Sequence, residues 1–264
     1  MLLLSSSELV KRFAFLFALA ILASLVAACS SPTDKKLAAY GLRRGRLAGA
    51  VLKGADLELV RLPQEDMSHS DLTGANLRGA NLEGANLSGA KLTKADMRAI
   101  RLKNTVEGKW VNTNLKGANL ARARLDEALL RGADLRGAKL DEASLKNADL
   151  SAGFITDRYG SCLATSNCIG ASFRNADLRG AKLMTCLKDA NLDGADLRGA
   201  KLGLVEGTSL RNADLRGADL SAAFGHIRSL KGAIYDSSTM WPKGFKPETR
   251  EVRKVEREDT NADR

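Results

Sequence analysis

The sequence has little of what most enzymes and metalloproteins need. Its 264 residues include two histidines, four cysteines and only 5% aromatic residues. It contains no CxxC pair, no HExxH and no glycine-rich phosphate loop, so we expect no metal site and no cofactor. Because aromatic side chains are scarce and glycine is frequent (24 residues), the composition favours a narrow core of small aliphatic side chains.

Only one stretch suggests catalysis, and we interpret it as a surface turn. Ser68, His69, Ser70 and Asp71 follow one another, but neighbouring residues of an extended coil point in different directions. A catalytic triad needs its base to face both the nucleophile and the acid. His226, beside a glycine, is no better placed. Opposite charges such as those of Asp134 and Arg136 are explained more simply as pairs between neighbouring coils. The sequence therefore predicts a protein that is not an enzyme.

What the sequence does contain is a repeat of five residues. Between Leu42 and Leu102 a leucine or methionine recurs at every fifth position, with a small residue two positions before it in most units. A helix would place apolar residues three and four apart, and a plain strand would alternate with a period of two. A period of five fits short extended pieces joined by corners that often contain Gly, as at Gly79 and Gly84. Such repeats predict a solenoid.

The repeated Ala-Asp/Asn-Leu tripeptide, as at residues 75–77, 80–82 and 85–87, resembles the pentapeptide-repeat family. The resemblance implies an all-β fold, a right-handed quadrilateral β-helix in which four units make one coil. Leu and the small residue two positions before it would point inward. Residues 40–242 would form about ten coils and, at about 4.8 Å per coil, a rod about 48 Å long. The segment from Trp241 to Phe245 resembles the aromatic segments that close this fold at its C-terminus.

The five-residue register breaks three times. We expect insertions near residues 103–114, 153–170 and 203–208, where surplus residues would bulge from the column. Loops carry function more often than scaffolds do, although bulges on a solenoid are often neutral. After the repeats, residues 243–264 are charged and poor in large apolar side chains, so we expect a disordered or loosely helical tail.

The N-terminus is typical of an exported protein. Lys11 and Arg12 precede an uncharged apolar run over residues 13–28, which is short for a membrane span and typical of a signal peptide. The ending Val26-Ala27-Ala28-Cys29 resembles the lipobox of bacterial lipoproteins. That resemblance implies cleavage of residues 1–28, lipid (diacylglycerol and palmitate) on Cys29, and, because Ser30 follows, an outer-membrane destination facing the periplasm. The alternative is an ordinary signal peptide or an uncleaved anchor. In the lipoprotein interpretation, which we favour, residues 29–39 would form a polar tether.

The charge of the chain favours anionic partners. The net charge is +10, and +9 after loss of residues 1–28, which carry only Glu8, Lys11 and Arg12 as charged side chains. Lipid head groups and nucleic acids are the usual anions. Because the chain is predicted to be exported, we expect the membrane surface and no nucleic acid.

An oxidising compartment would also allow disulfides. Cys162 and Cys168 lie close together in the second insertion, so we expect a disulfide there, with Cys168–Cys186 as the alternative and free thiols as a third outcome.

The sequence leaves three functions open. The first, which we favour, is a non-catalytic, lipid-anchored scaffold of the bacterial cell envelope that binds an unknown protein or cell-wall partner. The second is a DNA mimic that binds a topoisomerase, as the quinolone-resistance members of the pentapeptide-repeat family do. A basic, exported chain argues against it, because a mimic of DNA needs a dense anionic face. The third is a ligand- or ion-binding protein that uses the Cys162–Cys168 insertion.

Overall fold

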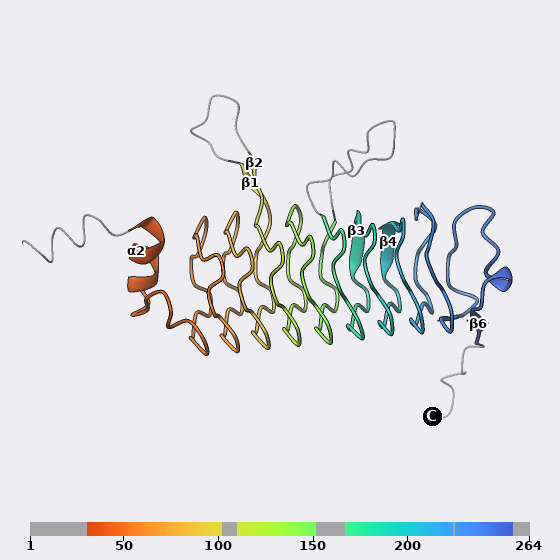
Figure 1. Cartoon of the computed structure of the whole chain (residues 1–264), viewed down its shortest axis with the longest axis horizontal. Coiled ribbons are helices and arrows are strands. Elements are labelled where there is room, and N and C mark those ends of the chain that lie inside the picture. The colour runs from red at the N-terminus through yellow and green to blue at the C-terminus, as the bar shows by residue number, and fades with distance from the viewer. Residues whose placement is uncertain (1–30, 102–109, 152–166, 224, 256–264) are drawn as a thin grey trace, which may run out of the picture.

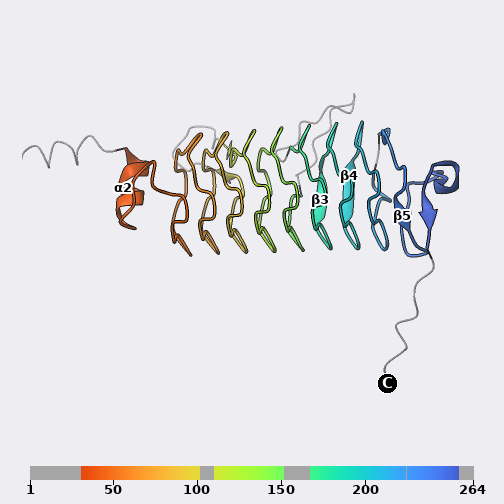
Figure 2. The ribbon, with the colours of Figure 1, turned by 60° about the horizontal axis from the view of Figure 1, so that its bottom comes forward.

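The computed structural model describes residues 31–101, 110–151, 167–223 and 225–255, which form a four-sided column (Figures 1 and 2). Extended helices and strands are few. The elements are α2 (Pro32–Ala38), β1 (Ile100–Arg101), β2 (Trp110–Val111), β3 (Lys182–Cys186), β4 (Lys201–Leu204), β5 (Ile234–Tyr235), the 3₁₀ turn η1 (Pro247–Thr249) and β6 (Arg253–Lys254). Most of the column is held by parallel pairs of single residues.

Hydrogen bonds between successive coils explain why a period of five is stable. Asp71 pairs with Val51 and with Lys91, so the chain returns over itself after four five-residue units. The Leu52 amide donates to the carbonyl of Asp71 (2.8 Å), and the Asp71 amide donates to the carbonyl of Ala50 (2.8 Å). A third bond, from the Ala55 amide to the carbonyl of Leu52 (3.0 Å), closes the corner within one coil. The backbone groups of each unit are thus satisfied by the coils on either side.

The core is the predicted spine of leucines. Every Leu or Met of the register is buried from Leu47 to Met97 and from Leu115 to Leu150, as are the alanines two positions before most of them. This part of the sequence prediction is confirmed. Alternate residues of each short extended piece face inward, so the Asp or Asn between Ala and Leu faces outward.

Most corners contain a residue in the left-handed backbone conformation. Glycine often takes it, as at Gly89 (φ +67°), but His69 takes the same conformation (φ +57°) one coil earlier. A side chain at such a corner lies over the corner of the next coil. A Cβ atom added to Gly89 would lie 2.6 Å from Nδ1 of the His69 ring. Gly at one corner therefore makes room for the side chain of its neighbour.

Four breaks in register fall at the same corner of the column, and a fifth, of one extra residue, lies between Ile234 and Met240 at another corner. The four follow the residues Asp96, Asp149, Lys182 and Lys201, which belong to one continuous row of paired residues, and the chain re-enters the column in the next row at Asn114, Asn167, Cys186 and Leu204. Figure 1 shows the β1–β2 hairpin and strands β3 and β4 along the same side of the column. The other three corners keep the regular spacing through most of the column.

Two of the three expected insertions need correction. The column resumes at Asn167, so residues 167–170 belong to a coil and not to the second insertion. At the third site nothing is inserted. Leu202 and Val205 are both buried core residues only three positions apart, so the unit is shortened. Gly203 fits there because an added Cβ would lie 3.1 Å from the carbonyl oxygen of Thr185. At the first site β1 and β2 pair antiparallel and flank residues 102–109, which lie outside the described structure.

The N-terminal end of the column is closed by a helix, where we expected a tether. Helix α2 has Ser31 as its N-cap, with reciprocal hydrogen bonds between Ser31 and Asp34, and Leu37 is fully buried. The Thr33 hydroxyl accepts a hydrogen bond from the Arg61 amide (2.9 Å). Residues 32–38 are therefore part of the folded body, and the expectation of a tether over residues 29–39 is wrong for them.

The C-terminal end is closed by aromatic rings and a further strand. Trp241 stacks on Phe245 (4.9 Å between centroids) and meets Tyr235 edge-on (5.5 Å). Strand β6 pairs in parallel with β5 and continues the sheet past the last unit. The expected tail thus begins later than residue 243, because the chain remains folded through Val255.

Candidate functional site

One face of the column carries a continuous row of paired charges. The sequence Asp-Leu-Arg-Gly occurs at residues 177–180, 196–199 and 214–217 in three successive coils. Asp177 pairs with Asp196, and Asp196 with Asp214, in the backbone ladder. The Leu of each motif is buried, so the Asp before it and the Arg after it face outward. We call these six charged residues the charged ladder: Asp177, Arg179, Asp196, Arg198, Asp214 and Arg216.

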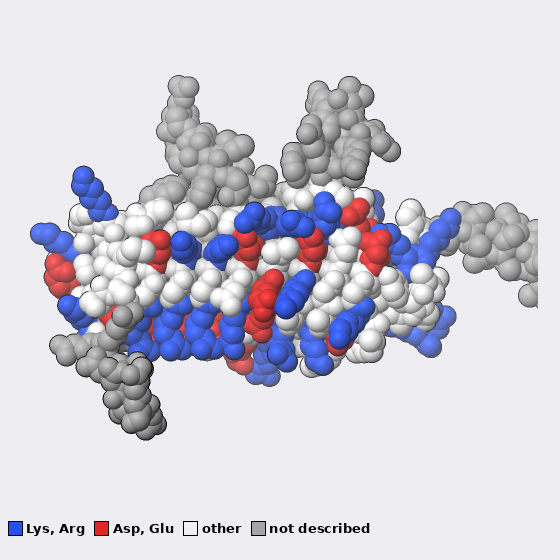
Figure 3. Space-filling model, turned by 180° about the vertical axis from the view of Figure 1, so that it is seen from behind, with Lys and Arg blue, Asp and Glu red and all other residues white. Residues whose placement is uncertain are grey.

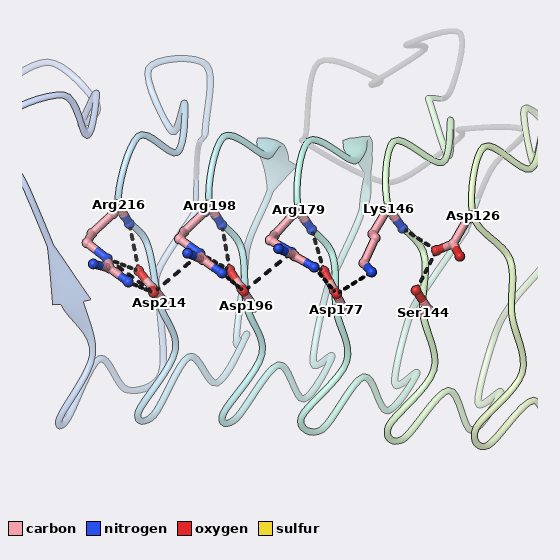
Figure 4. Close-up of polar contacts among 9 residues, drawn as sticks. All are labelled: Asp126, Ser144, Lys146, Asp177, Arg179, Asp196, Arg198, Asp214 and Arg216. Atoms are coloured by element: carbon pink, nitrogen blue, oxygen red, sulfur yellow. Dashed lines mark hydrogen bonds and ion pairs between the residues drawn. The ribbon is translucent and has the colours of Figure 1, made fainter. Parts of the chain in front are cut away.

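Ion pairs run both within and between the coils of the charged ladder (Figure 4). Within each coil the guanidinium Nη2 lies 2.6–2.7 Å from the Asp two positions earlier. Between coils, Arg179 Nε lies 3.6 Å from Asp196 and Arg198 Nε lies 3.7 Å from Asp214. The Lys146 ammonium, 3.4 Å from Asp177, extends the row by one coil. Each of the three Asp residues is therefore shared by two cations.

Hydrogen bonds keep two carboxylates of the charged ladder, those of Asp177 and Asp196, ionised. The hydrogen bond from the Arg179 side chain lowers the pKa of Asp177. Burial alone would raise the pKa of Asp196, but hydrogen bonds from the Arg198 side chain and backbone, together with its charge, outweigh burial and lower that pKa. The face is consequently a fixed array of alternating charges, with as many carboxylates as guanidinium groups.

One coil earlier the same face is built differently. The Asp126 carboxylate accepts hydrogen bonds from the Ser144 hydroxyl and from the Lys146 amide (3.1 Å), so it reaches across to the next coil. Asp126 thus accepts hydrogen bonds from the next coil, whereas each Asp of the charged ladder accepts them from the Arg of its own coil. The row changes from local pairing to pairing between coils without a gap.

The sequence matches the pentapeptide repeats family in eight copies, over residues 66–105, 112–151, 161–203 and 204–224. These segments make up more than half of the chain. The chain is a pentapeptide-repeat protein. Members of this family are right-handed quadrilateral β-helices, in agreement with the four units that make one coil here.

Solved structures of other pentapeptide-repeat proteins resemble the chain. HetL of the cyanobacterium Nostoc sp. PCC 7120, involved in heterocyst differentiation regulation, is 30% identical, with 77% of this chain and 82% of HetL covered and a TM-score of 0.26. QnrB1, a plasmid-mediated fluoroquinolone resistance protein, is 15% identical, with 78% and 92% covered and a TM-score of 0.33. A pentapeptide-repeat protein from the thylakoid lumen of Arabidopsis thaliana is 24% identical, with 56% and 72% covered and a TM-score of 0.14. No curated protein matches.

The cysteine predictions for this pentapeptide-repeat protein need correction. Cys168 is a free, buried thiol, so neither Cys162–Cys168 nor Cys168–Cys186 is formed. The reason is its position. Cys168 occupies the place of the central Leu and points into the core, whereas Cys186, although also buried, stands one position before the central Leu187 of the next coil. Burial raises the pKa of Cys168 to about 12, which removes it from thiol chemistry.

Cys186 is disulfide-bonded, and its partner lies outside the described residues. Because Cys168 is free, the sequence leaves Cys29 and Cys162 as the candidates. Both of these lie in parts of the chain that the structure does not describe, so the lipid attachment predicted at Cys29 stays a prediction.

The histidine stretch does not form a triad. Ser70 is fully buried and its hydroxyl donates to the carbonyl of Met67 (2.7 Å). The Asp71 carboxylate accepts from the Thr73 amide (3.1 Å), and the His69 ring lies over Gly89 of the next coil. The three side chains therefore have separate partners. Within the described ranges, no group of three His, Cys, Asp or Glu residues could hold a metal ion.

A cleft near the C-terminal end was not predicted from the sequence. Its lining includes Val205, His226, Lys243, Phe245 and Arg250. These residues come from the last coils and from the closing segment, which the sequence pattern alone does not bring together. The charged ladder was likewise not predicted from the sequence. Its motifs are visible in the sequence, but their alignment depends on where the shortened units fall.

Proposed function

We propose that this pentapeptide-repeat protein is a non-catalytic, lipid-anchored scaffold of the bacterial cell envelope that binds a protein or cell-wall partner through the charged ladder. The observation that carries the proposal is the ladder itself. It is a flat row of charges held in place by the coils beneath it. Such a surface suits recognition of a complementary charged partner and contains no pocket in which a substrate would be enclosed.

The charged ladder is poorly explained by stability alone. Exposed ion pairs contribute about 0.2–1 kcal/mol each, which is little beside the leucine core. The side chains of Arg179, Arg198 and Arg216 remain 39–43% exposed while their geometry is fixed. A partner that binds them would lose less side-chain entropy than one that binds free arginines. Arginine is also enriched in protein interfaces, because its planar group forms several hydrogen bonds at once.

Two features support the envelope as the site of action. The sequence before Cys29 resembles a lipobox, and the disulfide at Cys186 fits an oxidising compartment. Among the residues that the structure describes, no helix is long and apolar enough to cross a membrane. Attachment through lipid would leave the whole column outside the bilayer, with its faces accessible to a partner.

Labelling with radioactive fatty acid tests the anchor. We expect the wild-type protein to be labelled and Cys29→Ala not to be labelled. Equal labelling of the two would contradict lipid attachment at Cys29.

Site-specific photocrosslinking in intact cells tests the charged ladder. A crosslinker at position 198 should capture one defined partner, and a crosslinker at Lys139, which is exposed on another face, should not. The exchange of one pair, Asp196→Arg with Arg198→Asp, keeps both charges and should abolish capture from position 216. Equal capture from positions 198 and 139 would contradict a role of this face.

Two further observations separate the proposal from the alternatives. A DNA mimic would protect gyrase. Because the charged ladder has as many cations as anions, we expect the purified mature chain not to protect it. A ligand- or ion-binding role of the second insertion can no longer use Cys168, because that thiol is buried in the core.

A further inference from the structure

We infer that the N-terminal end of the column is a membrane-contact surface for anionic phospholipid head groups. The inference concerns the first coil and helix α2, and it deepens the proposed function, on whose lipid anchor its cellular setting rests. The charged ladder plays no part in it. Two independent features of this end, exposed apolar side chains and unpaired cations, indicate the same partner.

Large apolar side chains are exposed mainly at this end. Among the described residues four large hydrophobic side chains are exposed, and three of them, Tyr40, Val51 and Leu59, lie in the segment that opens the column. Val51 is 76% exposed although it stands where later coils have Asp, Lys or Arg. Exposed apolar side chains that gather beside charged ones mark an interaction surface.

The segment that carries these apolar side chains is also rich in cations. Residues 31–62 contain seven Lys or Arg against three Asp or Glu, a net charge of +4. Lys36 is paired with Asp56 (3.1 Å) and Arg44 with Asp34 (3.0 Å). The remaining cations are exposed and form no ion pair with any described residue; we call them the basic collar: Lys35, Arg43, Arg46, Lys53 and Arg61. Figure 3 shows basic side chains at this end of the column.

The basic collar lies close to the predicted anchor. Ser31 is the N-cap of α2, and Cys29 is two residues before it. Two extended residues span at most about 7 Å. Helix α2 itself is fixed to the first coil, because the Lys36 ammonium donates to the carbonyl of Glu58 (2.8 Å) and the Thr33 hydroxyl accepts from the Arg61 amide. A lipid on Cys29 would therefore hold the collar at the membrane surface, with no tether to keep it away.

The chemistry of this end matches that surface. Basic residues near an anionic leaflet are attracted to its head groups, and neighbouring apolar and aromatic side chains enter the interface. Tyr40 is suited to this depth because its ring is apolar and its hydroxyl polar, and here the hydroxyl accepts a hydrogen bond from the Asp56 amide (2.8 Å). The contact would set the column upright, with the charged ladder running away from the membrane.

Vesicle flotation with the mature chain, residues 29–264 carrying Cys29→Ser, tests the contact without the lipid. Both end caps and every described coil lie within residues 31–255, so this chain contains the whole folded body. We expect binding to phosphatidylcholine vesicles that contain phosphatidylglycerol and none to pure phosphatidylcholine. The triple variant Arg43→Glu, Arg46→Glu and Lys53→Glu should bind at least 100-fold more weakly, since each cation near the surface contributes about fivefold.

The C-terminal end supplies a matched control. Lys243, Lys246 and Lys254 are also exposed, and changing all three to Glu alters the net charge by the same amount. This control should keep binding within about threefold, whereas Val51→Ser should weaken binding several-fold with no change in charge. None of the substituted side chains is buried, so we expect each variant to keep the stability of the column. Urea denaturation of each variant checks this.

Two results would overturn the inference. One is equal binding to vesicles with and without phosphatidylglycerol, and the other is equal loss in the two triple variants. Failure of the anchor is a separate result. A chain that is not labelled with fatty acid but binds anionic vesicles through the collar keeps the contact and loses the anchor. A labelled chain whose collar does not bind keeps the anchor and loses the contact.

Discussion

The alternation between core and charged face is tested most directly by substituting two adjacent residues. Leu197 and Arg198 are neighbours in the chain but face opposite ways. Leu197 is fully buried in the spine, and Arg198 belongs to the charged ladder. We compare Leu197→Ala with Arg198→Ala in the mature chain.

The expected magnitudes differ severalfold. Leu197→Ala removes three carbon atoms from a site with no access to water, and such substitutions cost about 2–5 kcal/mol because the cavity is only partly refilled. The coils above and below are themselves filled by leucines of the same spine, so little collapse is expected. Arg198→Ala removes ion pairs at 2.6 Å and 3.7 Å from a half-exposed side chain, and exposed pairs contribute about 0.2–1 kcal/mol each. We therefore expect a loss of about 3 kcal/mol against about 1 kcal/mol.

Urea denaturation, followed by circular dichroism, measures the loss of stability in each of the two variants. Repeat proteins can unfold in segments, so the midpoint and the steepness of the transition are compared for wild type and variants. Leu197→Ala should lower the midpoint clearly, and Arg198→Ala only slightly. If Arg198→Ala cost as much as Leu197→Ala, the charged ladder would be a main source of stability, and the argument that it exists for binding would fail.

Three further predictions follow from single contacts. Gly89→Ala should destabilise the column because the new Cβ would lie 2.6 Å from Nδ1 of the His69 ring, and His69→Ala in the same chain should restore part of the loss in thermal denaturation. Under non-reducing conditions Cys168 should react with iodoacetamide only after denaturation, and mass spectrometry should find Cys186 in a cross-linked peptide; rapid labelling of native Cys168 would contradict its place in the core. Because the folded pKa of Asp196 is held below 3.8, its stabilising contribution is present above pH 3.8 and is lost as the pH falls through the folded value. Urea denaturation at pH 6 and pH 2.5 should therefore show that acid lowers the free energy of unfolding of Asp196→Asn by less than that of wild type. Equal decreases in the two proteins would refute this.

The regular part of the fold could be predicted from the sequence because the information is local. A buried Leu every five residues, with a small residue two positions before it, identifies the inward positions of each unit without knowledge of its neighbours. Applied after the second break, the same reasoning places Phe173 and Leu178 in the core, and both are fully buried. It failed at Cys168 because the second insertion was given too many residues, so the thiol was assigned to a loop when it occupies a Leu position.

The closing helix was missed although the sequence signals it. Ser31 as N-cap, Pro32 in the first turn and Asp34 three residues after the cap are the usual start of a helix. The short, lysine-containing segment was interpreted as a tether because it follows a lipobox-like sequence. Burial of Leu37 at the open end of the spine explains why the helix docks there. Without this helix the column would leave its first leucines and strand edges exposed.

The position of the register breaks explains how the charged ladder stays continuous. A five-residue repeat that loses a residue would normally shift every later side chain to another place on its face. Here Asp177 still pairs with Asp196, although the unit after Leu183 is one residue short, and Asp196 still pairs with Asp214, although the unit after Leu202 is shorter again. Strands β3 and β4 absorb both losses by running straight through the corner where these two breaks occur. Since that corner does not border the ladder face, the rungs remain in register. Had either loss occurred between an Asp and its Arg, the ion pairs between coils would have been broken. The irregular corner is therefore what allows chain length to vary while the face that we propose for partner binding keeps a fixed pattern of charge.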